Sequence, residues 1–224
     1  MPTAVLLSGG LDSAVLLMEE AAAGEAQPLY VRVGLAWESA EREAIARFIE
    51  AAELGSRIRP LAELSVDMTD VYPRSHWAVQ GQPPGYHTPD QDVYLPGRNV
   101  ILFGKAAVFC AAAGIGRMVI GTLDHNPFPD ATPAFRAAMQ TALSLGLDHP
   151  ISLEAPYARR SKADVIRRGA ALGAPMALTL SCMKPAEGLL HCGLCSKCRE
   201  RHLAFVEAGV ADPTTYSDQK FIKS

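Results

Sequence analysis

The segment Leu7–Ser13 (LSGGLDS) gathers two glycines, two serine hydroxyls and one carboxylate into seven residues. Glycine lets a backbone turn tightly and approach a ligand closely. Helix-forming residues follow from Ser13, so the first N–H groups of a helix would point toward this segment. Such a junction suits phosphate or pyrophosphate, although it has neither a Walker lysine nor a dinucleotide-binding fingerprint. The alternative is an ordinary helix cap formed by Asp12 or Ser13.

Four of the five cysteines crowd into the last quarter of the chain. They are Cys182, Cys192, Cys195 and Cys198, which supply two overlapping C-x-x-C units and a fourth thiol. Four thiolates at this spacing suit a closed tetrahedral site, and we expect one Zn²⁺ ion there. An iron–sulfur cluster is the main alternative, because it also takes four cysteines. The nearby His191 and His202 are not expected to be ligands.

Two cations stand at the predicted starts of helices. Arg98 precedes an apolar run, and its planar guanidinium could pair with phosphate oxygens rather than serve, with Asn99, as a polar cap. Lys162 follows Ser161, which has the capping-box spacing to Asp164. A lysine in the first turn opposes the helix dipole, so an anionic ligand would explain its position. A solvated lysine is the alternative.

A scaffold for these side chains can be predicted from the apolar runs. Predicted strands cover residues 4–7, 28–34, 56–61, 118–122 and 151–156, and predicted helices cover 13–23, 38–54, 100–113, 133–145 and 161–172. Strands that alternate with helices predict an α/β fold with a doubly wound parallel sheet. Ligands bind such sheets at the carboxyl ends of the strands, where Leu7–Ser13, Gly34 and Gly121 all fall. The helix 100–113 is apolar nearly all round, so we expect it to be buried in the core.

The chain is expected to divide into an α/β domain, residues 1–175, and a C-terminal zinc-binding segment, residues 176–224. Residues 65–96 break the alternation of strands and helices and contain five prolines. A loop of this length in a compact domain is usually functional or disordered, and its aromatic residues argue against plain disorder. We therefore predict that residues 65–96 form a lid over the site.

The composition narrows the class of protein. Hydrophobic residues make up 49% and charged residues 20%, which is typical of a globular chain. The net charge of −3 argues against extensive nucleic-acid binding. The sequence has no apolar run of membrane-spanning length and no secretory leader, so we expect a cytoplasmic protein with no membrane association.

Taken together, these motifs resemble the 7-cyano-7-deazaguanine synthase family of queuosine biosynthesis, within the N-type ATP pyrophosphatase superfamily. The resemblance covers nearly the whole chain. The matching segments are 8–13, 95–99, 119–121, 129–130, 133–135, 161–162, 172–175, 181–182 with the other three clustered cysteines, and 205–210.

The resemblance implies an ATP-dependent ligase. Such an enzyme adenylylates the carboxylate of 7-carboxy-7-deazaguanine, takes up ammonia to give an amide, and dehydrates the amide to a nitrile after a second activation. It also implies Mg²⁺ for the triphosphate, zinc on the four cysteines, and a homodimer. The residues expected to bind ATP are Leu7, Ser8, Gly9, Gly10, Leu11, Asp12, Ser13, Ala14, Val15, Leu16, Leu17, Gly34 and Gly121. Asp12, Ser13, Arg98 and Lys162 are the candidate catalytic residues.

Two segments depart from the family pattern. The polar run expected after the second strand is replaced by Leu35–Trp37, and Ala131–Ala134 lacks an Arg and a Glu that the family shows. The nucleotide side is therefore retained, whereas residues expected on the acceptor side differ. One alternative is a paralogue that adenylylates another carboxylate, an amide, a tRNA base or a protein end. Another is a non-catalytic nucleotide-binding module with zinc.

Overall fold

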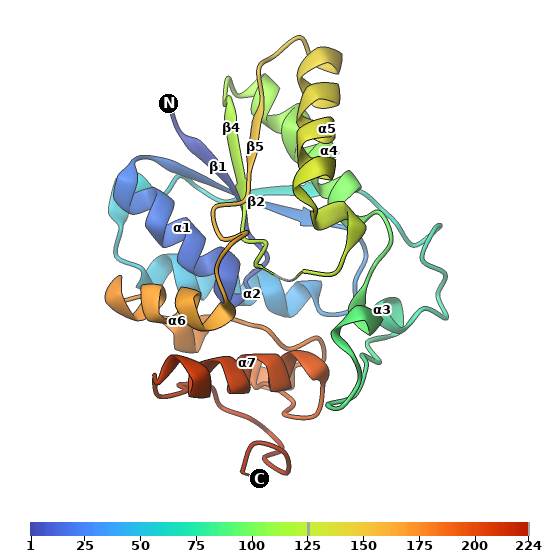
Figure 1. Cartoon of the computed structure of the whole chain (residues 1–224), viewed down its shortest axis with the longest axis vertical. Coiled ribbons are helices and arrows are strands. Elements are labelled where there is room, and N and C mark those ends of the chain that lie inside the picture. The colour runs from blue at the N-terminus through green and yellow to red at the C-terminus, as the bar shows by residue number, and fades with distance from the viewer. Residues whose placement is uncertain (125, 224) are drawn as a thin grey trace.

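The computed structural model describes residues 1–124 and 126–223 and contains a five-stranded, all-parallel sheet (Figure 1). The strands are β1 (Thr3–Leu6), β2 (Ala26–Arg32), β3 (Ala62–Ser65), β4 (Arg117–Ile120) and β5 (Ser152–Glu154). Their order across the sheet is β3-β2-β1-β4-β5, with Leu6 paired to Leu29 on one side and to Ile120 on the other. Strands β2 and β3 are added on one side of β1, and β4 and β5 on its other side. This order confirms the predicted doubly wound α/β class.

Helices cover both faces of the sheet. They are α1 (Leu11–Ala23), α2 (Glu38–Ala51), α3 (Trp77–Gln80), α4 (Arg98–Ala112), α5 (Pro133–Gly146), α6 (Lys162–Ala171) and α7 (Ser196–Ala208). Side chains of α4 and α5 pack with Leu6, Leu29 and Met118 on one face. Those of α1, α2 and α6 pack with Val5 and Val119 on the other. Figure 1 shows α1 and α6 on one side of the sheet, and α4 and α5 on the opposite side.

The predicted third strand, residues 56–61, is wrong. Gly55–Arg57 instead forms a 3-10 turn, and Ile58 makes only an isolated bridge to Ala26. Pro60 lacks the N–H group that a strand needs for its ladder. The observed strand, β3, begins at Ala62, two residues after Pro60. Its alternate side chains are half-buried at the edge of the sheet.

The helix predicted over 100–113 forms as α4, but the expectation that it is buried all round is wrong. Phe103, Ala106 and Cys110 face the core, whereas Val108 is 54% exposed. A helix that packs on one face of a sheet buries one stripe only, and apolar residues on its other side are left in solvent.

Residues 65–96 follow β3 and carry α3. The neck of this loop is closed because Tyr72 Oη donates to the carbonyl of Pro96 over 2.7 Å. Its far end is held by Arg199, whose Nη1 donates to the carbonyls of Tyr86 and Thr88 at 2.5 and 3.0 Å. Whether the loop opens as a lid stays a prediction.

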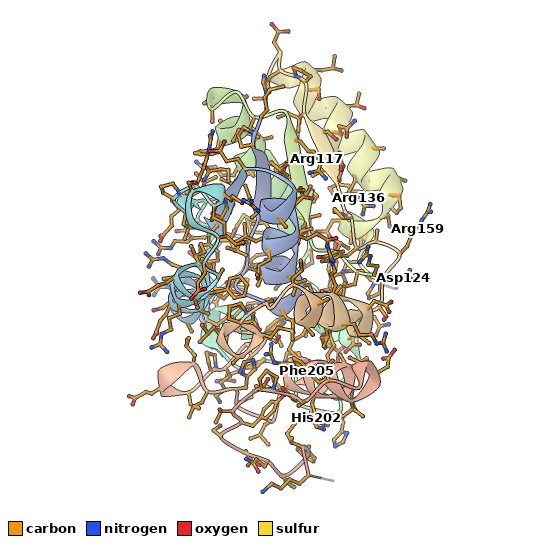
Figure 2. All side chains as sticks on the ribbon, turned by 90° about the vertical axis from the view of Figure 1, so that its left-hand side faces the viewer. Arg117, Asp124, Arg136, Arg159, His202 and Phe205 are labelled. Atoms are coloured by element: carbon orange, nitrogen blue, oxygen red, sulfur yellow. The ribbon has the colours of Figure 1, made fainter. Side chains whose placement is uncertain are left out.

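The C-terminal segment packs onto the sheet domain through α7. Phe205 of α7 is fully buried among side chains of α1 and α6. In Figure 2, Phe205 and His202 lie toward one end of the molecule and Arg117 of β4 toward the other. The division at residue 175 stays a prediction. Every helix within the described residues is too short or too polar to cross a membrane.

Candidate active site and cysteine cluster

The glycine-rich segment forms the turn between β1 and α1. Gly10 is the residue before α1, and no side chain caps that helix. Ser13 Oγ instead donates to the carbonyl of Gly10 over 3.0 Å and accepts from the N–H of Ser8 over 3.1 Å. The cap expected as the alternative at Asp12 or Ser13 is therefore not formed, and the N-terminus of α1 keeps its capacity for an anion.

The turn is tight enough to require glycine. Gly9 has φ +72°, and a Cβ built there would lie 3.0 Å from the carbonyl oxygen of Glu41. At the end of β4, a Cβ on Gly121 would lie 3.2 Å from the backbone of both Asp12 and Ser13. The end of β4 and the first turn of α1 therefore meet closely at the carboxyl edge of the sheet.

A first cavity of about 180 Å³ opens at this edge. Seven of the predicted site residues line it: Leu7, Ser8, Gly10, Asp12, Ser13, Arg98 and Gly121. Ala14, Val15, Leu16 and Leu17 are instead buried beneath it in the core. Gly34 lies in the turn after β2, where its N–H donates to Glu38 Oε1 over 3.0 Å.

A second cavity of about 230 Å³ shares Ser8, Gly10, Asp12 and Arg98 with the first. Its other walls come from α1, α2, α6, the loop 65–96 and the C-terminal segment. They include Leu11, Trp37, Glu41, Trp77, Val93, Leu95, Lys162, Leu180, Cys182 and Lys197. The indoles of Trp37 and Trp77 stack with centroids 5.9 Å apart. The predicted lid loop thus forms part of the wall.

Arg98 lies where the two cavities meet. Its Nε is buried and has no hydrogen-bond partner among the residues that the structure describes. The neighbouring Asn99 serves as the structural anchor, because its backbone N–H and its side-chain amide both donate to Asp130, at 3.0 and 3.1 Å. The guanidinium is therefore oriented by the start of α4 and remains available to an anion.

A partly buried group of four charges lies beside the glycine-rich turn. Lys162 Nζ lies 3.1 Å from Asp12 Oδ2 and 2.5 Å from Glu200 Oε1, and Lys197 Nζ lies 2.6 Å from Glu200 Oε2. Burial raises the pKa of Asp12, an effect that Lys162 opposes. For Glu200 burial acts in the same direction, but Lys162 and Lys197 outweigh it and lower its pKa. For Lys162 burial acts to lower the pKa, but Asp12 and Glu200 outweigh it and raise it.

Glu41 is the buried carboxyl of the second cavity. It accepts from Tyr30 Oη over 2.6 Å and from Trp37 Nε1 over 3.1 Å. Burial raises its pKa to about 7, although the charge of Arg98 and the two hydrogen bonds oppose the shift. The sequence offered one weak signal for this residue, an acidic residue on the otherwise apolar stripe of its helix.

The two departures from the family pattern have structural roles. Leu35 and Trp37 are buried in the core that carries α4 and α5, at 5% and 6% exposure. Thr132 caps α5, because its Oγ1 accepts from the N–H of Phe135 over 3.2 Å. Arg136, one turn into that helix, donates to the carbonyl of Ala131 over 2.6 Å. Trp37 is therefore part of the wall of the second cavity, whereas Leu35, Thr132 and Arg136 line neither cavity.

The four clustered cysteines converge on one point, with all four Sγ atoms within 4.8 Å of one another. The Sγ of Cys198 lies 3.8 Å from that of Cys192 and 3.5 Å from that of Cys195. A tetrahedral ion with bonds of about 2.3 Å to sulfur requires sulfur–sulfur distances of about 3.8 Å. The N–H groups of Lys184 and Cys192 both donate to Cys182 Sγ at 3.3 Å, as expected for a thiolate. The donor set therefore fits a metal ion.

Arg201 joins separate parts of the C-terminal segment around this cluster, a role that the sequence pattern did not suggest. It is fully buried and donates to the Oγ1 atoms of Thr179 and Thr214 at 2.8 and 2.6 Å, and to the carbonyl of Met176 at 2.9 Å. His191 is also buried, and its Nε2 accepts from the N–H of Ser181 over 3.1 Å. Burial lowers the pKa of His191 to about 3, so it is neutral and structural.

The fold and these sites define a class: a doubly wound α/β protein with an uncapped glycine-rich turn at its carboxyl edge and a four-cysteine cluster packed beside it. The chain belongs to the family of the queuosine biosynthesis protein QueC, whose model matches residues 3–209. The 7-cyano-7-deazaguanine synthase of Azoarcus sp. (strain BH72) is 36% identical over 226 residues, which cover 95% of each chain. The protein of that name from Anaeromyxobacter dehalogenans (strain 2CP-C) is 36% identical over 95% of this chain and 94% of its own. The predicted family resemblance is confirmed.

Proposed function

We propose that this protein is an ATP-dependent ligase that converts 7-carboxy-7-deazaguanine and ammonia to 7-cyano-7-deazaguanine. The observation that carries the proposal is the junction of two cavities at Ser8, Asp12 and Arg98, in a chain whose relatives of nearly equal length bear the synthase name. One cavity would hold the nucleotide and the other the acceptor. A paralogous acceptor is disfavoured, because the relatives that match 95% of this chain carry the synthase name.

The reaction balances with two molecules of ATP. A carboxylate oxygen attacks the α-phosphorus, and the bond to the bridging oxygen breaks with release of pyrophosphate. Ammonia then displaces AMP from the acyl carbon and loses a proton, which gives the amide. The amide oxygen is adenylylated by a second ATP, with loss of pyrophosphate and a proton. Departure of AMP and of the remaining N–H proton leaves the nitrile.

The residues of the turn would supply the charge stabilisation that this chemistry needs. Negative charge develops on the leaving pyrophosphate, and preorganised N–H donors and cations stabilise it. The N-terminus of α1 supplies N–H groups, and Arg98 and Lys162 supply positive charge. Asp12 Oδ1 is buried and has no hydrogen-bond partner in the described parts of the chain, so it is an oxygen available to the Mg²⁺ that accompanies ATP.

The second cavity would receive the heterocycle. The faces of Trp37 and Trp77 and the apolar side chains of Val93 and Leu95 suit a planar ring. Glu41 and Arg98 supply the polar contacts in the same cavity. The carboxylate of the acceptor would then point toward Arg98, at the boundary with the nucleotide cavity.

The cysteine cluster would hold one zinc ion in a closed, structural role. The convergence of the four sulfurs and the N–H donors to Cys182 support this assignment. Zinc with four thiolates has no open position for substrate. The ion would fix the chain around Cys182, which forms part of the wall of the second cavity. The homodimer implied by the family resemblance stays a prediction.

The decisive experiment incubates the purified protein with 7-carboxy-7-deazaguanine, ammonium and Mg·ATP. We expect a product that is lighter than the amide by one water molecule, with two AMP formed for each nitrile. Mass spectrometry and nucleotide chromatography measure the two quantities. AMP release that does not depend on this acceptor, or no nitrile at all, would contradict the proposal.

A further inference from the structure

We propose that Glu200 is a positioning residue, which holds the ammonium of Lys162 at the wall of the cavity beside Asp12. Through this contact the metal-binding segment would set the charge arrangement of the ATP site. The inference rests on the proposed function only in taking ATP as the ligand. It adds a residue of α7, outside the glycine-rich turn, to the parts that determine nucleotide affinity.

Three helices that are remote in sequence meet at Lys162. Asp12 lies in the first turn of α1, Lys162 is the first residue of α6, and Glu200 lies in α7. Figure 1 shows α6 next to α7, and the two pack together. Lys162 lies 2.5 Å from Glu200 and 3.1 Å from Asp12, so the carboxylate on α7 makes the shorter contact.

The environment of Lys162 makes its position sensitive to Glu200. The lysine side chain is only 14% exposed, and an ammonium out of water needs carboxylate partners. Without Glu200, Asp12 would be the single remaining carboxylate within ion-pair distance among the described residues. Lys162 would then draw closer to Asp12, whose oxygens would be less available to the cation that accompanies the nucleotide.

Glu200 is also held in place from the opposite side. Its second oxygen binds Lys197, which lies on the same helix and also lines the second cavity. The helix itself begins directly after Cys195. Glu200 is therefore oriented by a rigid element that carries Cys198 and directly follows Cys195, which is what a positioning role requires.

The test is a double-mutant cycle in ATP affinity. The variants are Glu200→Gln, Lys162→Met and the double variant, in the full-length, metal-loaded protein. Equilibrium binding of Mg·ATP is measured calorimetrically without acceptor. We expect Glu200→Gln to weaken ATP binding by about tenfold, and to have no further effect when Lys162 is already Met. Glu50→Gln removes the same charge from an exposed site on α2, away from this group, and should leave the affinity unchanged.

Metal content and thermal unfolding are measured for every variant. If Glu200→Gln does not fold, Glu200→Asp replaces it in the cycle, because it keeps the charge and loses one methylene. Additive effects of the two substitutions, or an unchanged affinity in Glu200→Gln, would overturn the role of Glu200. Absence of ATP binding by the unmodified protein would instead overturn the proposed function.

Discussion

The backbone N–H of Leu180 donates a hydrogen bond to the carbonyl oxygen of Gly9 over 2.8 Å. Gly9 lies in the turn that faces the first cavity, and Leu180 lies two residues before the first cysteine of the cluster. The geometry of the turn and the conformation of the cysteine-rich segment are thus joined through one backbone contact. Order in the four-cysteine cluster should therefore affect the proposed nucleotide site.

Removal of the metal should weaken ATP binding as well as stability. Chelation, or the substitution Cys198→Ser, would release the chain around Cys182 and loosen the contact between Leu180 and Gly9. We expect about one zinc per chain before treatment and a loss of roughly tenfold in ATP affinity after it. Elemental analysis and calorimetry measure both. Cys110→Ala is the matched control, because Cys110 lies on the buried face of α4, outside the cluster. ATP affinity that survives complete metal loss would contradict this coupling.

Gly9→Ala should abolish ATP-dependent activity and destabilise the fold. The new Cβ would meet the carbonyl of Glu41 at 3.0 Å, and φ +72° is unfavourable for alanine. We expect a loss of about 1–2 kcal/mol in the free energy of unfolding from the backbone conformation alone, measured by denaturant titration. Gly146→Ala is the control, since nothing lies within 4 Å of a Cβ there. A Gly9→Ala protein with normal turnover would show that the turn tolerates a different path.

Arg98→Met should lower AMP formation by roughly 100-fold, because a cation between the two cavities would stabilise charge only as pyrophosphate leaves. The apolar stem is retained, so the fold should be preserved. Arg159→Met serves as the control, because Arg159 is exposed and points away from the body of the protein in Figure 2. The rate of AMP release at saturating ATP and acceptor distinguishes the two variants. If the Arg98→Met and Arg159→Met variants release AMP at the same rate, Arg98 has no role in the proposed active site.

Glu41 should make stability depend on pH. Burial raises its pKa from 4.5 to about 7, so the folded protein binds this proton more tightly than the unfolded chain does. Stability from this group is therefore present below about pH 4.5 and is lost as the pH rises toward about 7. The loss between pH 5 and 8 amounts to about 2–3 kcal/mol. The Glu41→Gln variant should not lose this contribution. The difference in free energy of unfolding between the variant and the native chain should therefore shift in favour of the variant as the pH rises. A constant difference between the two proteins would contradict this assignment.

The local motifs were the predictable part of this protein. The turn at Leu7–Ser13 and the four cysteines have chemistry that depends on spacing along the chain, and both appear where they were expected. The alternation of strands and helices likewise gave the sheet class. The third strand was misplaced because residues 56–61 and 62–65 are both short and weakly apolar, and pairing with β2 decides between them.

The contacts of the site depend on tertiary packing and could not be predicted. Lys162 and Glu200 are 38 residues apart, and nothing in either segment indicates the other. Lys162 was expected to face an anion, and in this structure its ammonium contacts two carboxylates. For Glu41 the sequence holds only the weak signal of an acidic residue on an apolar stripe. Its burial depends on packing beside Trp37 and Tyr30, which donate hydrogen bonds to it.

The anchoring of the loop 65–96 has an evolutionary consequence. Tyr72 and Arg199 hold the loop by hydrogen bonds to the backbone carbonyl oxygens of Pro96, Tyr86 and Thr88. Every residue type has such an oxygen. Substitution of the side chains at those three positions leaves these hydrogen bonds available. Outside Tyr72 and Asp90, whose side chains themselves take part in this anchoring, the sequence of the loop can therefore drift while its path is retained, and the wall of the second cavity can change residue by residue.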